Sequence, residues 1–281
     1  MKFSWLGFLL CISTFAYPQV PNAKDILKQT LAACDNLKTA KYVLRKKERL
    51  INGTLRESEA IIKLNVHPYK AYVYSVFPNP GAEVLYVAGS NSGNALVNPN
   101  KFPFINLNLS PFSPILREDQ HHTSLDLGFA YITSVIKNNI RQNENYFYGS
   151  LVYEGETEWN KRSCYRISIN NKNFGYIEYT VQPGENITTI AIKRNISDYM
   201  ILSVNSGLKG YHDVKGGQVI KIPNSYAKQI LLYVDKATLL PLGQYIYDDK
   251  GLFEEYELSS FILNPLFQPE EFTAAWKDYH F

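Results

Sequence analysis

Two spacings of apolar residues alternate along this chain and predict two kinds of element. Over residues 25–37, Leu27, Leu31 and Cys34 recur at the spacing that places apolar side chains on one face of a helix. From residue 42 onward, short runs of alternating apolar and polar positions are separated by Gly, Pro and Asn, which is typical of an antiparallel meander. The strands predicted in this part are residues 42–49, 62–66, 71–76, 83–87, 94–97, 146–148, 151–153 and 164–169.

Local signals refine this pattern at three places. Asn52-Gly53 predicts a tight hairpin turn between the first two strands, because both residue types tolerate positive φ angles. Thr123, with Asp126 three residues later as a capping partner, predicts that a helix begins there and extends over residues 123–140. The basic run at residues 45–49 is interpreted as the solvated side of the first strand, in preference to a binding patch.

The strand pattern is interrupted in the middle of the chain and then resumes. Residues 230–235, 240–247 and 252–258 again read as strands, but so short a meander needs something to cover its apolar face. We therefore expect these strands to complete the sheet that begins before residue 179. The predicted fold class is α+β, with a curved antiparallel sheet or incomplete β-barrel and packing helices, interrupted by an inserted segment at residues 179–223.

Composition supports a packed β-rich protein and excludes one class of partner. The chain has 21 Tyr, 15 Phe and 3 Trp among its 281 residues, and aromatic rings pack well on a pleated surface. Hydrophobic residues make up 45% and charged residues 20%, as in a globular core. The net charge of +3 is too small to attract nucleic acid, so no nucleic-acid binding is expected.

The N-terminus has the pattern of a secretory signal at residues 1–16. Lys2 precedes an apolar run at residues 5–12 that is too short to span a membrane, and small residues follow near a plausible cleavage site. We expect export to the periplasm or outer cell envelope, with no transmembrane segment after cleavage. A buried N-terminal helix is the alternative. A lipid anchor on Cys11 is not expected, because Leu10 stands where a small residue is required.

Two cysteines remain once the signal is removed. In an oxidising compartment Cys34 and Cys164 either pair as a disulfide, which would tie the first helix to a later strand, or remain two buried apolar thiols.

Residues 179–223 resemble the LysM (lysin motif) domain. The matching residues include Tyr179-Thr180-Val181, Pro183-Gly184-Glu185-Asn186-Ile187, Asn195-Ile196-Ser197 and Gly217-Gln218-Val219-Ile220-Lys221-Ile222-Pro223. The resemblance implies a small βααβ domain that binds N-acetylglucosamine-containing glycans, such as peptidoglycan, in a shallow groove. Carried over by position, the groove would be lined by Gly184, Glu185, Asn186 and Ile187 on one side and by Asn205, Ser206, Gly207 and Leu208 on the other.

The expected chemistry of this groove suits a polymer of neutral amides. Backbone groups would pair with acetamido groups while Ile187 and Leu208 cover their methyls. This sequence departs from the family at Asn186, where Thr or Ser is frequent, and at residues 211–213, where many members are shorter. The alternative is a LysM fold retained as a spacer or a protein-contact module.

The remainder of the chain resembles two exported bacterial families. Lys46-Lys47-Glu48-Arg49, Ile62-Lys63-Leu64-Asn65-Val66 and His121-His122-Thr123 are similar to the family known as domain of unknown function 1571. Tyr233-Val234-Asp235-Lys236, Leu240-Pro241-Leu242 and Gly251-Leu252-Phe253-Glu254 are similar to the closing strands of LolA-like lipoprotein carriers. The resemblance implies an incomplete barrel able to hold acyl chains, with a lipid or lipoprotein as partner. The expected division is a signal at 1–16, a discontinuous β domain at 23–178 and 224–281, and LysM at 179–223.

The strongest candidate for catalysis or metal binding is His121-His122 beside Glu118-Asp119, because imidazole and carboxylate together serve acid–base chemistry. No spaced His or Cys completes a ligand set, so a capping role at a helix start is preferred. No catalytic residue, metal or cofactor is predicted. We expect a non-enzymatic envelope protein that binds peptidoglycan through LysM and an apolar ligand through its β domain. The alternatives are a cell-wall hydrolase that uses His121 or His122, and a structural scaffold without a cavity.

Overall fold

The computed structural model describes residues 22–102 and 104–281, so the signal expected at residues 1–16 lies outside the described residues. The helices are α1 Ala23–Asp35, α2 Pro114–Arg117, α3 Ala130–Gln142, α4 Glu144–Ser150, α5 Ile187–Arg194 and α6 Asp198–Val204, with short 3₁₀ turns η1 Asn91–Gly93 and η2 Pro269–Phe272. The strands are β1 Thr39–Arg49, β2 Leu55–Asn65, β3 Lys70–Phe77, β4 Glu83–Val87, β5 Ala95–Asn98, β6 Leu107–Leu109, β7 Leu151–Trp159, β8 Arg162–Asn170, β9 Tyr176–Thr180, β10 Val219–Pro223, β11 Gln229–Asp235, β12 Pro241–Asp248 and β13 Gly251–Leu263. Across the described ranges, no helix is long and apolar enough to cross a membrane.

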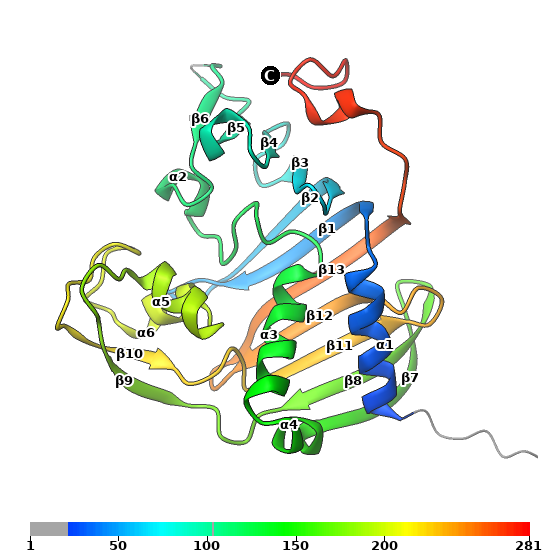
Figure 1. Cartoon of the computed structure of the whole chain (residues 1–281). Coiled ribbons are helices and arrows are strands. Elements are labelled where there is room, and N and C mark those ends of the chain that lie inside the picture. Colours follow the sequence, from blue (N-terminus) through cyan, green and yellow to red (C-terminus); the bar gives the residue numbers. More distant parts are fainter. Residues whose placement is uncertain (1–21, 103) are drawn as a thin grey trace, which may run out of the picture.

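One curved antiparallel sheet of eleven strands organises the chain (Figure 1). Its strand order is β6-β5-β4-β3-β2-β1-β13-β12-β11-β8-β7, so the sheet is open, with β6 and β7 at its edges. β8 and β11 are hydrogen-bonded neighbours although residues 171–228 separate them in the chain. Those residues include a separate two-stranded sheet, β10-β9, and the helices α5 and α6. The predicted fold class, an antiparallel sheet with helices interrupted by a βααβ segment, is confirmed.

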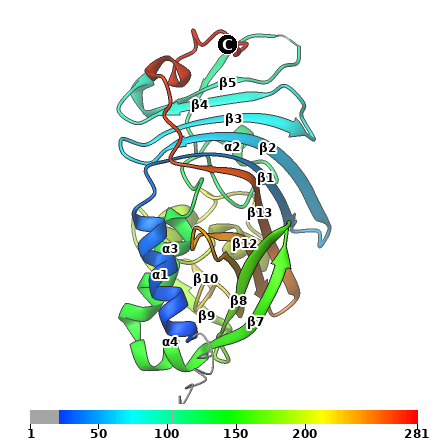
Figure 2. The same cartoon turned by 90° about the vertical axis from the view of Figure 1, so that its right-hand side faces the viewer.

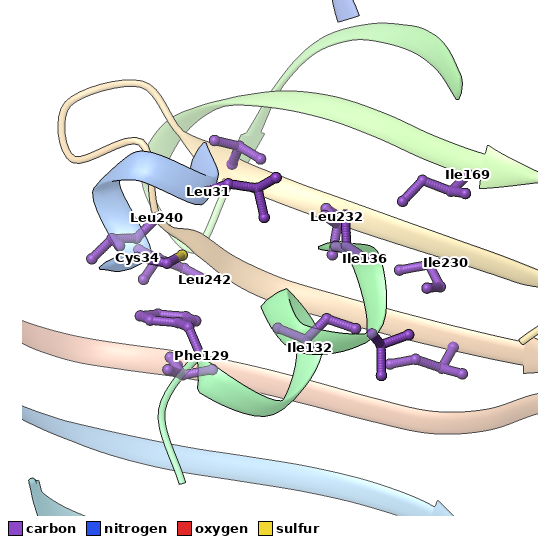
Figure 3. Packing of buried hydrophobic residues seen from close by; sticks show 14 of the residues in the cluster. Leu31, Cys34, Phe129, Ile132, Ile136, Ile169, Ile230, Leu232, Leu240 and Leu242 are labelled. Carbon is purple, nitrogen blue, oxygen red and sulfur yellow. The ribbon is translucent and has the colours of Figure 1, made fainter. Parts of the chain in front are cut away.

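Helices α1 and α3 cover one face of the β13–β8 half of the sheet (Figure 2). The apolar spacing predicted for α1 is confirmed, since Ile26, Leu27, Leu31 and Cys34 are buried. The two helices and the strands beneath them bury one continuous apolar cluster, in which each large aliphatic side chain stabilises the fold by about 1.5–3 kcal/mol. Figure 3 shows how the helix-side residues Leu31, Cys34, Phe129, Ile132 and Ile136 gather with the strand-side residues Ile169, Ile230, Leu232, Leu240 and Leu242 in one cluster.

The helix predicted over residues 123–140 begins later, at Ala130, and ends at Gln142. The predicted capping contact does form, because the Thr123 N–H and hydroxyl both donate to the Asp126 carboxylate at 2.8 Å. Gly128 interrupts the helix before it can continue, since its φ of 84° is not helical. The Gly128 N–H donates instead to the Tyr42 hydroxyl at 3.0 Å. A cap without a following helix is therefore what misled the prediction.

Residues 146–148, predicted as a strand, belong to helix α4. Their aromatic side chains favour strands, but the Asn143 side chain caps the first turn by accepting from the Tyr146 N–H. Phe147 is buried against the main core. The local cap and this burial outweigh the strand preference of three aromatic-rich residues.

The hairpin predicted at Asn52-Gly53 is confirmed, with a longer loop than the two-residue turn. β1 ends at Arg49 and β2 begins at Leu55. Of the pair, only Gly53 has a positive φ, of 86°. The Asn52 side chain instead accepts from the N–H and hydroxyl of Thr54.

The structure records Cys34 and Cys164 as free, buried thiols. This is the alternative of two apolar thiols, and the disulfide is not formed in it. Burial raises the pKa of Cys34 to about 12 and that of Cys164 to about 11, so both stay protonated at neutral pH.

Candidate functional site

The segment 176–223 folds around its own apolar core and is called the module below. Val181, Ile187, Ile190, Ile201 and Ile222 are among the buried residues of this core. The Asn186 side chain caps α5 in a reciprocal capping box with Thr189. A reciprocal polar cap thus fixes the point at which the turn from β9 enters the first helix.

A hollow of about 460 Å³ lies on the surface of the module between the loop after α6 and strand β10. It is lined by Glu178, Val204, Asn205, Ser206, Gly207, Leu208, Gln218, Val219, Ile220 and Lys221. Exposure alternates along β10, so that Val219 and Lys221 point outward, and Lys221 lies opposite Glu178 on β9. The hollow is therefore open to solvent and combines aliphatic with charged side chains.

All four groove residues predicted on the second side lie in this hollow. Asn205 fixes the loop to β10, because its side chain donates to the Lys221 carbonyl at 2.7 Å and accepts from the Lys221 N–H at 2.9 Å. Ser206 and Gly207 are exposed, and Leu208 is half-buried. Asn205 thus holds the loop after α6 in place, while Ser206, Gly207 and Leu208 form the accessible wall of the hollow.

The four residues predicted on the first side do not line the hollow among the residues that the structure describes. Gly184 is exposed in a turn with φ of 81°. The Glu185 carboxylate accepts from the Gln182 N–H and the Tyr179 hydroxyl, and these contacts lower the pKa of Glu185. Asn186 is occupied as the helix cap.

The expectation that Ile187 covers an acetamido methyl group is wrong for its side chain. Ile187 is fully buried in the module core, because it is the first residue of α5 and faces inward. Its N–H donates to the Tyr211 carbonyl at 2.9 Å, so this backbone donor is also used within the module.

Tyr211, the first of the residues 211–213 noted above as a departure from the family, joins the module to the rest of the chain. The Tyr211 ring stacks on the Arg117 guanidinium, with 3.6 Å between the guanidinium carbon and the ring centroid. Arg117 also donates through two nitrogens to the Asp198 carboxylate, both at 2.8 Å. The Arg117 side chain is only 2% exposed, so this contact is shielded from water.

Helix α6 fastens the module further by entering the main apolar core. Tyr199 and Met200 are buried there, together with residues of the large sheet. The Tyr199 ring lies 4.0 Å from the His121 ring, and its hydroxyl accepts from the Ile51 N–H. The module is therefore packed against the sheet instead of hanging from it as a tethered bead.

A second site is a cavity of about 570 Å³ on the helix-bearing face of the sheet. Strands β1 to β5, β12 and β13 provide its floor, and α3 contributes Tyr131 and Ile132. Residues 114–128, which we call the strap, cover it from the other side through residues such as Ile115, Leu116 and Leu127. The strap leads from α2 to α3 across β1 and β13 (Figure 1).

The strand register grades this floor from apolar to polar. One row across neighbouring strands is entirely aliphatic or aromatic: Val97, Val84, Val73, Ile62 and Tyr42. The next row carries Ser75, Ala60, Leu44 and Leu258. Further along the strands the row is polar, with Ser58, Lys46, Tyr256 and Gln244, and beyond it lie Arg56, Glu48 and Glu254.

The basic run was expected to form the solvated side of β1, and this is wrong for Lys46. Because successive strand residues face opposite sides, Lys46 and Glu48 share the inner face with Tyr42 and Leu44. The Lys46 ammonium donates to Glu48 at 3.0 Å and to the Gln120 side chain. Lys47, on the outer face, pairs with Glu57 at 3.1 Å as expected of a solvated position.

His121 and His122 do not cap a helix, and their partner is neither Glu118 nor Asp119. Glu118 is exposed, while Asp119 pairs with Arg56. His121 is buried with both ring nitrogens occupied, by Glu254 at 2.9 Å and by the Arg49 carbonyl at 3.0 Å. His122 lines the cavity, with its Nε2 3.4 Å from the same Glu254 carboxylate.

Glu254 is the centre of this cluster, and sequence reasoning missed it. Its carboxylate also accepts from the Tyr226 hydroxyl at 2.6 Å and is completely buried. Burial raises the pKa of Glu254, but His122 and His121 outweigh it and hold the pKa well below the usual range. Two signals pointed to it: Glu254 continues the inner face of β13, two residues before Tyr256, and it ends the motif Gly251-Leu252-Phe253-Glu254.

The positive and negative groups of the cluster stabilise one another's charged forms. Burial lowers the pKa of His122, but Glu254 and Asp126 outweigh it and raise the pKa to about 9. Burial raises the pKa of Glu48, but Lys46 and the two histidines outweigh this effect, so the pKa of Glu48 is lowered overall. At neutral pH the polar end of the cavity therefore holds paired cations and anions.

Comparisons with protein families confirm two of the resemblances found in the sequence. A family described as "Protein of unknown function (DUF1571)" matches residues 38–174, and the LysM domain matches residues 179–223. No curated protein matches the chain.

Solved structures show low similarity over most of the chain. A MucA/MucB complex from Pseudomonas aeruginosa matches 90% of this chain at 13% identity with a TM-score of 0.44, and the match covers 61% of that chain, so the present chain spans about three fifths of its length. The lipoprotein LppX from Mycobacterium tuberculosis matches 87% of this chain and 97% of its own at 12% identity and a TM-score of 0.41. A putative outer membrane lipoprotein-sorting protein domain from Vibrio parahaemolyticus matches 90% and 97% at 11% identity and a TM-score of 0.35.

Proposed function

We propose that this chain is a binding protein of the bacterial cell envelope, which holds N-acetylglucosamine-containing glycan through its LysM module and an apolar ligand in its cavity. The observation that carries the proposal is the cavity of about 570 Å³, floored at one end by aliphatic side chains, in a chain whose LysM module presents a separate, solvent-facing hollow. Ligand sites typically enclose about 300–1,000 Å³. Peptidoglycan is the glycan expected in the periplasm or outer envelope, to which the apolar run at residues 5–12 would direct the chain.

The hollow supports the glycan part of the proposal on one side only. Ser206, Gly207, Leu208 and Val219 offer backbone groups and aliphatic surface, which suit an acetamido group and its methyl. We therefore assign glycan binding to the loop after α6 and to β10, with Gly184, Glu185 and Asn186 as supports of the turn.

Binding is better supported than hydrolysis or a purely structural role. Both nitrogens of His121 are occupied by protein groups, which leaves this ring nothing to exchange with a substrate. The scaffold alternative assumed that the β domain has no cavity, and the cavity beneath the strap argues against it.

A test of glycan binding should keep the chain intact, because Tyr199 and Met200 belong to the main core and deleting the module would expose it. Gly207→Trp places a large side chain in the hollow, and neither φ nor neighbouring atoms obstruct a Cβ there. Gly210→Trp is the matched control, since a Cβ is equally unobstructed there and residue 210 lies outside the hollow. We expect Gly207→Trp to weaken sedimentation with peptidoglycan sacculi about tenfold, which corresponds to ~1.4 kcal/mol.

Equal sedimentation of both variants and the unaltered protein would place the glycan-binding site elsewhere.

The proposed apolar ligand site in the cavity is tested separately with N-phenyl-1-naphthylamine, whose fluorescence rises in an apolar site. Ala60→Trp fills the cavity floor and should abolish the rise, whereas Ala274→Trp, at an exposed position, should retain it. Release of muropeptides from sacculi by the purified protein would instead favour the hydrolase.

A further inference from the structure

The polar end of the cavity has an uneven supply of hydrogen-bonding groups. Each oxygen of its two buried carboxylates already accepts from a protein donor: Glu48 from Lys46 and the Tyr256 hydroxyl, and Glu254 from His121 and the Tyr226 hydroxyl. A cationic ligand group would find no free carboxylate on this part of the floor.

Several donors at the same end have capacity left. The Lys46 ammonium has three N–H bonds and uses two of them, toward Glu48 and Gln120. The Nδ1 of His122 lies 3.9 Å from the nearest carboxylate oxygen, of Asp126, which is too far for a hydrogen bond. The Tyr131 hydroxyl makes no hydrogen bond to the described residues, although Tyr131 lines the cavity beside His122.

Acidic residues elsewhere in the lining do not reverse this balance. Asp126 already accepts from Thr123. Glu118 is exposed and Glu59 is partly exposed, so water screens their charges at the rim. The half-buried donors of Lys46, His122 and Tyr131 therefore decide which ligand group can replace water at this end.

The geometry points to an amphiphile as the ligand, with an acyl chain along the apolar rows and a hydrogen-bond-accepting headgroup, a carboxylate or an ester carbonyl, facing Lys46, His122 and Tyr131. This inference rests on the proposed function, because it names the class of ligand that the same cavity takes. The apolar row from Val97 to Tyr42 holds the chain, and the row through Ser58 and Lys46 marks where it gives way to the headgroup.

Displacement of N-phenyl-1-naphthylamine by three ligands with the same chain tests the headgroup. Dodecanoate and methyl dodecanoate should displace the probe at concentrations about tenfold lower than dodecylamine, because only the first two accept hydrogen bonds from the spare donors. Tighter binding of dodecanoate than of its ester indicates a free acid as ligand, and equal binding indicates an esterified chain. Equal or stronger displacement by dodecylamine would overturn the inference while leaving the apolar site intact. Failure of the probe itself to bind would instead remove the apolar-ligand part of the proposed function.

Variants locate the headgroup. Tyr131→Phe removes one hydroxyl and should weaken dodecanoate about threefold to tenfold with unchanged probe affinity. Tyr153→Phe, outside the cavity lining on β7, is the matched control and should change neither. The double change Lys46→Met with Glu48→Gln removes both charges together, so that no unpaired carboxylate is left buried, and should weaken dodecanoate about tenfold. If dodecanoate binds the folded Tyr131→Phe protein as tightly as the unaltered one, the assigned headgroup position is wrong.

Discussion

Arg117→Met tests how much the shielded ion pair between the strap and the module contributes to stability. Removing one partner of a buried ion pair costs about 3–5 kcal/mol, because the other charge is left unpaired. Asp198 is 13% exposed, keeps the Thr188 hydroxyl at 3.0 Å and lies in the first turn of α6, where the helix dipole favours a carboxylate. We therefore expect a loss at the lower end, about 3 kcal/mol of unfolding free energy.

Urea unfolding followed by two probes measures this loss and locates it. All three tryptophans, Trp5, Trp159 and Trp276, lie outside residues 176–223, so tryptophan fluorescence does not report on the module, whereas far-ultraviolet circular dichroism reports on sheet and module together. The unaltered protein should show coincident transitions, because Tyr199 and Met200 share the main core. In Arg117→Met the circular dichroism transition should begin at a lower urea concentration than the fluorescence transition.

A similar pair at the far edge of the sheet supplies the control. Arg162 also binds Asp235 through two nitrogens, at 2.9 and 2.8 Å, but its side chain is 37% exposed. The Asp235 side chain is only 3% exposed, but it keeps two donors, the N–H and the hydroxyl of Thr238, whereas Asp198 keeps one, so Arg162→Met should cost only about 1 kcal/mol. The reasoning is refuted if Arg117→Met costs no more than Arg162→Met. Adding Asp198→Asn to Arg117→Met should recover part of the loss, since no unpaired charge then remains.

Two further predictions concern titration and thiol reactivity. The pKa of Glu254 is lowered in the folded protein, so its contribution to stability is present above its unfolded pKa and is lost as pH falls below about 4.5. The pKa of His122 is raised to about 9, so its contribution to stability is complete below about 6.5 and is lost as pH rises to 9. The urea midpoint should accordingly be highest between about pH 4.5 and 6.5, and Glu254→Gln should flatten both limbs; an unchanged profile in that variant would contradict the assignment. Because burial raises the pKa of Cys34 and Cys164, neither should react with Ellman's reagent until the protein is unfolded, and rapid reaction of either in the native state would disprove their burial.

Long-range architecture could be predicted where periodicity was strong and the chain had to close a sheet. We expected residues after 229 to complete the sheet begun before residue 179, because the apolar face of a short meander has to be covered by other elements. This expectation is confirmed, since β11 pairs with β8. Local errors came from short segments. Gly128 ended a helix signal that Thr123 and Asp126 had opened, and Asn143 capped a helix where aromatic residues favoured a strand.

The candidate sites were only partly accessible from the sequence. Asn205 to Leu208 could be carried over from a motif, because their loop is local in sequence. The cavity cluster could not, since Lys46, His122 and Glu254 come from two strands and the strap, more than 70 residues apart along the chain. Successive strand residues face opposite sides, so this rule alone places Lys46 on the same face of β1 as Tyr42. Applied to residues 45–49, the rule would have shown that the basic run cannot lie entirely on the solvated side.

Packing Tyr199 and Met200 into the main core fixes a direction as well as a contact. A tethered module would let the cavity opening sample all orientations around its attachment, whereas here one rigid angle relates the hollow beside β10 to the strap. If the module lies on a glycan strand as proposed, the cavity of every bound copy has the same orientation relative to that strand. A partner that diffuses along the wall then meets the opening by movement in two dimensions, and only the partner's own orientation has to be searched.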